Sequence, residues 1–313
     1  MTIRWGILGA AKFAREQMGP AIHMARGHEL TAVARRSGPV EGFEFADPRG
    51  VEGYETLLAD DGIDAVYIPL PNSEHVEWAV KAAEAGKHVL IEKPCAMDVA
   101  GVDALIEARN RTEVMIAEAY MIVHHPQWRR AREIVQGGEL GELVQIEAFF
   151  SFDNRDMGNI RNKPEMGGGA MRDIGVYTFG GPRFATGAEI EVEWADIAWE
   201  NDVDVVTRVA GRLAGASYLA MVSTRAALRQ EVTFHGTKGV LRLPVPFNAR
   251  VFGEPRVVLS RGMETIETRY PTDEQYVLQV EAFGSAIGGE DYACPLEFSR
   301  GTQAVIDRVL EMA

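Results

Sequence analysis

Short apolar runs and amphipathic segments alternate along the first part of the chain, and this alternation constrains the fold more than any other feature. The apolar runs have the length of strands and occupy residues 3–9, 29–35, 64–71, 88–94 and 113–121. Apolar residues at helical spacing fall between them, in residues 14–26, 51–60, 74–86 and 99–111. Strands that are apolar throughout are buried on both faces, so the pattern predicts a parallel sheet covered by helices on both sides. Ligands of such sheets bind beyond the carboxyl ends of the strands.

Longer runs in which apolar and polar residues alternate follow in the second part of the chain. They cover residues 142–152, 189–199, 204–213, 216–224, 229–237 and 239–245. Closely spaced turn signals separate them, so we expect a large, mostly antiparallel open sheet, completed by helices near 274–288 and 300–312. Apolar residues stand at positions that we expect on its open face, namely Val206, Val209, Tyr218 and Ala220. They favour a homodimer or homotetramer that forms through this sheet.

Charge and composition exclude several kinds of partner. The net charge is −14, which repels nucleic acid and anionic membranes, and no apolar run approaches the roughly 20 residues that span a bilayer. Cys95 and Cys294 form no disulfide framework, and the chain opens directly into an apolar strand without a signal peptide. We therefore expect a cytoplasmic protein. His124 and His125 are adjacent and would point to opposite faces of a strand, and no other spacing indicates a metal site.

The turn after the first strand has the position of a dinucleotide-binding turn. It reads G-A-A-K-F-A, and in the G-x-G-x-x-G frame only Gly9 is glycine, while Ala11 and Ala14 replace the other two. A helix N-terminus follows, where anionic oxygens are stabilised. We expect Gly9, Ala11, Lys12, Phe13 and Ala14 to bind the pyrophosphate of a dinucleotide; the alternative is an empty strand–helix turn.

The ends of the second and fourth strands suggest which dinucleotide binds. The second ends in Arg35, Arg36 and Ser37, where proteins that prefer NAD place an acid for the ribose 2′-hydroxyl. Two guanidiniums suit a 2′-phosphate, so we predict NADP over NAD; the alternative is a solvated arginine pair. The fourth ends in Glu92-Lys93-Pro94, where Lys93 would reach the nicotinamide side and Pro94 is permitted the cis form. The alternative is a surface lysine beside a turn.

Together these features resemble the Gfo/Idh/MocA oxidoreductase superfamily along nearly the whole chain. The resemblance rests on RWGILGAA (4–11), AAEAGKHVLIEKP (82–94), EAYMIVHHPQ (118–127), NIRNKPEMGGGAMRDIGVY (159–177) and QVEAFGSAIGG (279–289). It implies a Rossmann dinucleotide-binding domain over residues 1–122 and an α+β domain for substrate and oligomerisation over 123–313. It also implies that Leu70, Pro71, Asn72, His75, Glu92 and Lys93 contribute to the cofactor site.

The residue at position 177 places the chain in one branch of that superfamily. The inositol dehydrogenase branch carries a His there and an Asp three residues later, whereas this chain has Tyr177 and Gly180. It is more similar to the branch of glucose–fructose oxidoreductase, NADP-dependent xylose dehydrogenase and dimeric dihydrodiol dehydrogenase. That branch uses the tyrosine as acid/base with the lysine beside it. The resemblance further implies that Arg161, Asp173, Tyr177 and Tyr276 bind substrate, with a solvated Arg161 and a core Tyr276 as the alternatives.

The glycine-rich stretch from Gly167 to Gly181 precedes and enters a helix. Asp173 and Tyr177 are four residues apart and would share one helix face. The resemblance implies that the three glycines at 167–169 let the backbone pass close to the nicotinamide. Gly180-Gly181-Pro182 should bend or end the helix early, because proline lacks the N–H donor and clashes with the preceding turn.

These features predict an NADP-dependent oxidoreductase acting on a hydroxyl or carbonyl carbon of a sugar (aldose) or a small cyclic diol. Tyr177 would exchange the proton, assisted by Lys93, whose ammonium favours the tyrosinate of a phenol with an ordinary pKa near roughly 10. Asp173 would hold a neighbouring hydroxyl or orient Lys93. The alternative is a non-catalytic NADP-binding sensor or regulatory protein on the same scaffold.

Overall fold

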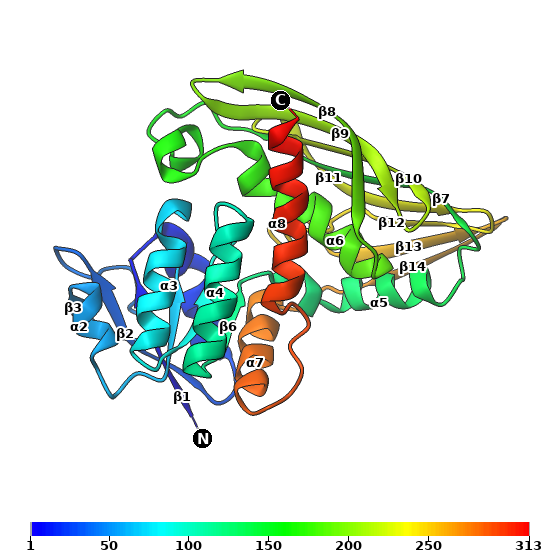
Figure 1. The fold of residues 1–313 in the computed structure, drawn as a ribbon. Helices are drawn as coiled ribbons and strands as arrows, with labels where there is room; N and C mark the ends of the chain where they lie inside the picture. Colours follow the sequence, from blue (N-terminus) through cyan, green and yellow to red (C-terminus); the bar gives the residue numbers. More distant parts are fainter. Residues whose placement is uncertain (1, 313) are drawn as a thin grey trace. The chain divides into compact units, whose positions relative to one another are not determined.

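The computed structural model describes residues 2–312 and divides into two compact units, each shown in Figure 1. The first unit comprises the residues up to Met121 together with Glu274–Arg300. The second unit comprises Ile122–Asp273 and the residues from Gly301 on. The segment Glu274–Arg300 therefore packs with the N-terminal residues, whereas the sequence suggested one continuous second domain from residue 123.

The first unit is built on a six-stranded sheet in which every pairing is parallel, as predicted. The strand order is β3-β2-β1-β4-β5-β6. The strands are β1 (Ile3–Leu8), β2 (His28–Arg35), β3 (Arg49–Glu52), β4 (Ala65–Ile68), β5 (His88–Ile91) and β6 (Ile116–Glu118). The chain builds outward from β1 first to β2 and β3, and then continues on the other side with β4. In sheets of this kind, ligands bind at the carboxyl ends of the strands where the order changes side.

Helices cover both faces of this sheet, which explains why its strands are apolar throughout. They are α1 (Gly19–Met24), which follows a π-helical turn (η1, Ala14–Met18), and α2 (Tyr54–Leu58), α3 (His75–Glu84), α4 (Val99–Thr112) and α7 (Gln275–Ile287). Leu8 packs on one face in a cluster that includes Trp78 of α3. Ile7 packs on the other face in a cluster that includes Phe283 of α7.

The prediction of a helix over residues 51–60 was wrong at its start. Residues Arg49–Glu52 form the edge strand β3, which pairs with β2, and the helix begins only at Tyr54. Gly53 between them has φ +85°, a left-handed conformation that ends the strand and that glycine adopts at little cost.

The second unit contains an eight-stranded sheet in the order β14-β13-β12-β11-β7-β10-β9-β8. Only the β7–β10 pair is parallel, so the predicted large, mostly antiparallel sheet is confirmed. Its strands are β7 (Leu143–Asp153), β8 (Ile190–Glu200), β9 (Val203–Leu213), β10 (Ala216–Ser223), β11 (Arg225–Gly236), β12 (Val240–Leu243), β13 (Arg256–Arg261) and β14 (Glu264–Arg269). The hairpin β13–β14 was not predicted, because its outer strand is exposed throughout and lacks an apolar alternation.

Two helices, α5 (Pro126–Gln136) and α6 (Val176–Thr186), cover one face of this sheet, and α8 (Leu296–Glu311) ends the described chain (Figure 1). The prediction of the open face was wrong for three of its four residues. Val209, Tyr218 and Ala220 are buried on the covered face, whereas Val206 is half-buried and shares the open face with exposed Arg208. Because strand side chains alternate, a one-residue error in phase exchanges the two faces. Within residues 2–312, no helix has the length and apolar character to cross a bilayer.

Candidate active site

The turn after β1 has the backbone shape that the dinucleotide frame requires. Gly9 has φ +107°, and its N–H donates to the carbonyl of Ala34 at 2.9 Å. A Cβ at this position would lie 3.0 Å from the Leu70 side chain, at the end of β4. The glycine is therefore needed both for its conformation and for the close approach of the next strand-end turn.

Phe13 and Tyr276, predicted separately as cofactor-binding and substrate-binding residues, lie together. Their rings meet edge to face, with centroids 5.4 Å apart. Burial raises the pKa of Tyr276, with a smaller contribution from Glu92, so its hydroxyl stays protonated. Lys12, in contrast, is exposed and lies 3.8 Å from Glu16.

The arginine pair after β2 is held by neighbouring groups. Arg35 donates to the Pro39 carbonyl. Arg36 donates to the Glu74 carboxylate, and its guanidinium lies 5.5 Å from the centre of the Tyr54 ring. Ser37 is exposed. The structure thus places two guanidiniums at this strand end, one of them fixed between an aromatic ring and a carboxylate.

A buried carboxyl group precedes Lys93. Glu92 continues β5, and its N–H donates to the Ile68 carbonyl at 3.1 Å. Its side chain accepts a 2.5 Å hydrogen bond from the Tyr67 hydroxyl. Burial raises the pKa of Glu92, whereas the Tyr67 hydroxyl and the charge of Lys93 act in the opposite direction. Tyr67 is a member of the site that the sequence did not reveal, since it stands inside an apolar strand.

The peptide bond between Lys93 and Pro94 is cis, the form that the sequence was expected to permit. The carbonyl of Pro94 lies 2.7 Å from His75 Nδ1, and the N–H of Cys95 donates to Glu118 at 2.9 Å. The His75 Nε2 atom lies 2.8 Å from the carbonyl of Leu70. His75 is fully buried between the backbone carbonyls of two strand ends and presents no surface to a ligand.

The three consecutive glycines in the second unit are each explained by local geometry. Gly167 and Gly169 have φ +75° and +113°. A Cβ on Gly168 would lie 2.6 Å from the carbonyl oxygen of Arg161, and a Cβ on Gly169 would overlap the Asp204 carboxylate. Asp204 in turn accepts a 2.7 Å hydrogen bond from the N–H of Met171, at the start of the helical segment. The glycines thus let a loop and a buried carboxylate approach the entry of this segment.

Asp173 and Tyr177 follow these glycines on one continuous helical segment. Asp173 lies in a π-helical turn (η6, Met171–Gly175), and Tyr177 lies in the first turn of α6. The Arg161 Nε–H donates to Asp173 at 2.6 Å, so the two residues predicted to bind substrate are paired with each other. The Arg161 guanidinium also lies 6.0 Å from the centre of the Phe152 ring.

The ring of Tyr177 packs in an aromatic cluster. Its centroid is 5.8 Å from that of Phe150 and 5.5 Å from that of Phe247. Both phenylalanines are buried, and they stack on each other at 5.2 Å. The two phenylalanines fix the ring of Tyr177, whose hydroxyl is the polar group of this side chain. Sequence analysis missed both phenylalanines, because nothing in the sequence relates them to position 177.

The expectation that Gly180-Gly181-Pro182 ends the helix early was wrong, since α6 continues to Thr186. Pro182 cannot donate to the carbonyl of Thr178 four residues earlier. That carbonyl instead accepts a 2.7 Å hydrogen bond from the Tyr218 hydroxyl. A Cβ on Gly181 would lie 2.5 Å from the Trp128 ring, so the glycine allows α5 and α6 to pack closely. Residues 180–182 therefore allow close packing against α5 without interrupting α6.

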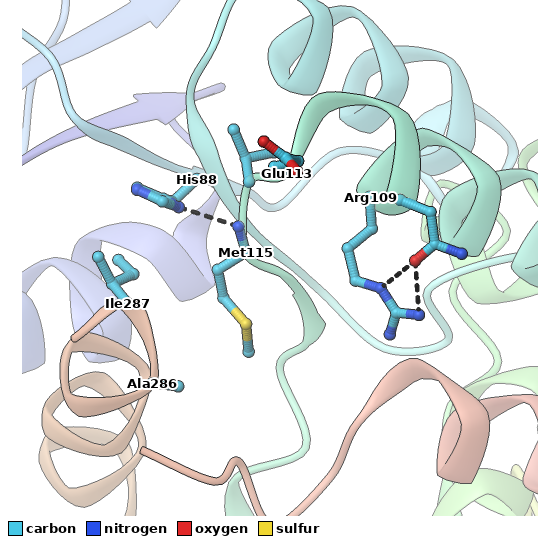
Figure 2. Close-up of a pocket in the computed structure, with 8 residues that line it drawn as sticks. His88, Arg109, Glu113, Met115, Ala286 and Ile287 are labelled. Carbon is cyan, nitrogen blue, oxygen red and sulfur yellow. Dashed lines mark hydrogen bonds between the residues drawn. The ribbon is translucent and has the colours of Figure 1, made fainter. Parts of the chain in front are cut away.

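Figure 2 shows a pocket of the first unit on the side of the parallel sheet where the strands begin. His88 and Met115 stand at the amino ends of β5 and β6, and Ile287 is at the end of α7. Arg109, at the end of α4, is held by a bidentate pair with Glu297 at 2.7 and 3.1 Å. Because ligands of parallel sheets bind at the carboxyl ends, this pocket is separate from the candidate site. Among residues 2–312, no three His, Cys, Asp or Glu side chains gather as metal ligands.

Comparison with protein-family models gives matches over both units. Residues 3–120 match the Gfo/Idh/MocA model described as an oxidoreductase family with an NAD-binding Rossmann fold. Residues 128–242 match the C-terminal domain model of the same group. An uncharacterised oxidoreductase of Rhizobium meliloti is 40% identical to the chain, over 99% of the chain and 97% of the relative.

Other similar proteins have a stated reaction. An NADP-dependent D-xylose 1-dehydrogenase of Haloferax volcanii is 34% identical, over 99% of the chain and 97% of the relative. A 3-ketoreductase from Actinomadura kijaniata, crystallised with NADP and TDP-benzene, is 30% identical, with a TM-score of 0.92 over 100% of this chain and 98% of that one. Variants of this ketoreductase with one tyrosine replaced by phenylalanine, or one lysine replaced by alanine, have also been crystallised.

Proposed function

Because the chain belongs to the Gfo/Idh/MocA family of oxidoreductases, we propose that it is an NADP-dependent enzyme that oxidises a hydroxyl carbon, or reduces a carbonyl carbon, of a sugar or small cyclic diol. Bound NADP accepts the hydride in the oxidation and NADPH supplies it in the reduction. The protein supplies the proton exchange and the binding of the sugar.

One observation carries the assignment of Tyr177 and Lys93. The tyrosine and the lysine replaced in the crystallised ketoreductase variants are separated by the same number of residues as Tyr177 and Lys93. A chain of matching fold thus has the same two residue types at the same spacing. This supports the proposal that the two residues act on one substrate.

In the proposed oxidation, the phenolate oxygen of Tyr177 takes the proton of the sugar hydroxyl as hydride leaves the same carbon. In the reduction, the phenol returns that proton to the carbonyl oxygen. The ammonium of Lys93 stabilises the negative charge on either oxygen. Asp173, held by Arg161, accepts a hydrogen bond from a neighbouring hydroxyl of the sugar and orients the ring, and Tyr276 completes the binding residues.

The cofactor proposal rests on the strand-end turns of the first unit. The left-handed Gly9 and the close approach of Leu70 form a cradle that a side chain would fill, and Arg35 and Arg36 offer charge-assisted bonds to a 2′-phosphate. We assign the cofactor to Gly9, Ala11, Lys12, Phe13, Ala14, Arg35, Arg36, Ser37, Leu70, Pro71, Asn72, Glu92 and Lys93, with His75 as their buried support.

A second substrate class is a sugar linked to a nucleoside diphosphate. Relatives at 31–32% identity are dTDP-3,4-didehydro-2,6-dideoxy-glucose 3-reductases, and the similar crystal structure holds TDP-benzene. The same proton exchange would serve both classes, because the reacting carbon belongs to the sugar in each. The choice between them rests on the assay below.

A substrate screen tests this function. Wild-type protein is assayed with NADP⁺ and NAD⁺ against aldoses, trans-diols and dTDP-linked sugars, and with NADPH against the corresponding ketones. We expect turnover of at least one sugar with NADP⁺ preferred. The Arg36→Ala variant should weaken NADP⁺ binding by about 10-fold, the loss of roughly one charge-assisted bond, and leave NAD⁺ binding unchanged. Arg111→Ala, in an exposed ion pair at the end of α4, is the control.

The outcomes separate the enzyme from the alternative. Tight NADP⁺ binding with no turnover across the whole panel would favour a sensor or regulatory protein. If the wild type bound NADP⁺ and NAD⁺ with equal affinity, Arg35 and Arg36 would not bind the 2′-phosphate and would be solvated surface residues.

We further propose that the protein forms a homodimer or homotetramer through the uncovered face of its large sheet. Trp194 of β8 and Leu219 of β10 both pair with Ala210 of β9, so the three side chains form one row across this face. Trp194 is 52% exposed and Leu219 is 38% exposed. Cys95 and Cys294 are buried as thiols, in keeping with a site of action in the reducing cytoplasm.

A further inference from the structure

One peptide unit next to Lys93 is hydrogen-bonded at both of its ends by buried side chains. The Pro94 carbonyl lies 2.7 Å from His75 Nδ1, and the Cys95 N–H donates to Glu118 Oε1 at 2.9 Å. The carbonyl and the N–H belong to the same planar group and point in opposite directions. The plane therefore cannot rotate without breaking both bonds.

The two side chains come from the elements on either side of β5. His75 begins α3, and its second ring nitrogen lies 2.8 Å from the Leu70 carbonyl, beyond the end of β4. Glu118 ends β6, the other neighbour of β5, and also bonds the Ser299 side chain. With the single N–H of the neutral imidazole on Nδ1, the turn that carries Lys93 is attached to α3 through His75 and to the end of β6 through Glu118.

Neither side chain is placed to contact a ligand, because His75 is 0% exposed and Glu118 is 4% exposed. Burying an ionisable group is costly, and an apolar pair of similar size would fill the space at less cost. Burial lowers the pKa of His75 and raises that of Glu118, and the charge of Lys93 lowers both by a smaller amount. Both groups therefore lie close to the amine whose position they would control.

We propose that His75 and Glu118 are positioning residues that fix the Pro94–Cys95 peptide plane and thereby the direction of the Lys93 side chain. This inference rests on the proposed function, in which Lys93 stabilises charge on the reacting oxygens. In addition to supporting the cofactor-binding turn, His75 would orient the side chain of Lys93. The inference also adds Glu118, the single acid within an otherwise apolar strand.

Matched substitutions separate the two contacts of His75. The side-chain amide of His75→Asn occupies the place of Nδ1 and keeps a donor for Pro94, whereas His75→Gln reaches the place of Nε2 and keeps the contact with Leu70. Glu118→Gln keeps an acceptor for the Cys95 N–H, and Glu118→Ala removes it. The inference predicts that His75→Asn and Glu118→Gln preserve turnover. His75→Gln and Glu118→Ala should lose it.

The first readout is the exchange rate of the Cys95 amide hydrogen, which requires no substrate. Exchange should accelerate by about 10-fold or more in Glu118→Ala and stay near the wild-type rate in Glu118→Gln, because only the alanine variant leaves the N–H without its acceptor. The second readout is kcat and KM for D-xylose, or for the best sugar of the screen, with NADP⁺. We expect His75→Gln and Glu118→Ala to lose about 10²-fold in kcat with little change in KM or in NADP⁺ affinity, as a misplaced catalytic group does.

A double-substitution test distinguishes positioning from general destabilisation. In a Lys93→Ala background, Glu118→Ala should cause no further loss of kcat, because its effect passes through Lys93. A full additional loss, unchanged Cys95 exchange in Glu118→Ala, or equal losses in His75→Asn and His75→Gln would overturn the inference. If Lys93→Ala alone keeps wild-type kcat, the proposed function fails, and Cys95 exchange still decides whether the peptide is clamped. Should Glu118→Ala not fold, the paired His75 variants decide the question.

Discussion

At the scale of single residues, the adjacent His124 and His125 are buried at the start of the second unit. Burial lowers the pKa of His124 to about 3, with a smaller contribution from Arg129, and that of His125 to about 4. An unfolded histidine has a pKa near 6.5. Below that pH the unfolded histidines bind protons and the native ones do not, so protonation favours the unfolded state. The contribution of each histidine to the free energy of unfolding is complete above about pH 6.5 and is lost as the pH falls toward the pKa of the folded residue.

The His125→Asn substitution tests this at a position where the local structure can be kept. His125 Nδ1 accepts a 3.1 Å hydrogen bond from the Gln127 N–H and caps α5, and asparagine is also a good cap. We expect a similar free energy of unfolding near neutral pH and a shallower decline on acidification. The slope should differ by about 1.4 kcal/mol per pH unit, measured by urea unfolding at several pH values. Parallel slopes in the two proteins would show that His125 is protonated equally in both states.

At the scale of one element, α6 replaces a missing backbone bond with a side-chain bond. Pro182 leaves the Thr178 carbonyl without its helical donor, and the buried Tyr218 hydroxyl fills that place. Tyr218→Phe should lower the free energy of unfolding by roughly 1–3 kcal/mol, because a buried carbonyl loses its partner. Adding Pro182→Ala should recover part of this loss, since alanine brings back the N–H. Denaturant unfolding of the single and double variants gives the comparison; a purely additive result would contradict this account of α6.

At the scale of the whole molecule, the uncovered face of the large sheet should control assembly. Leu219→Glu places a charge in the row formed with Trp194 and Ala210, so we expect it to shift the protein to monomers. Met263→Glu lies at the exposed β13–β14 turn, outside this row, and serves as the matched control. Light scattering of the wild type and both variants measures the mass of each. A wild-type monomer, or an oligomer that tolerates Leu219→Glu, would exclude this face as the interface.

The two sheets could be predicted from the sequence because their hydrophobic patterns are strong and regular. The parallel sheet follows from strands that are apolar on both faces, and the strand-end positions of Gly9, Lys93 and Pro94 follow from it. The face of β10 could not be predicted, because alanine and serine mix with larger apolar residues on both sides of that strand. A single residue of phase then decides whether Tyr218 faces α6 or solvent.

Roles that depend on tertiary contacts could not be predicted from sequence patterns. Proline inside a helix ordinarily ends it, and only the structure shows Tyr218 compensating for Pro182. Glu118 did leave a signal, as an acid inside an apolar run, but its partner Cys95 became apparent only with the folded chain. The aromatic packing around Tyr177 joins α6 to β7 and Phe247, which are far apart in sequence.

The most direct test of the central claim compares the wild type with Tyr177→Phe in steady-state turnover and in NADP⁺ binding. Removing one hydroxyl should leave NADP⁺ affinity unchanged and lower kcat for the sugar by about 10²–10⁴-fold, the usual contribution of a general acid or base. Tyr270→Phe, which alters a partly exposed tyrosine elsewhere in the second unit, should keep both values. Turnover of Tyr177→Phe at the wild-type rate would contradict the account, because the proton would then travel through a different group.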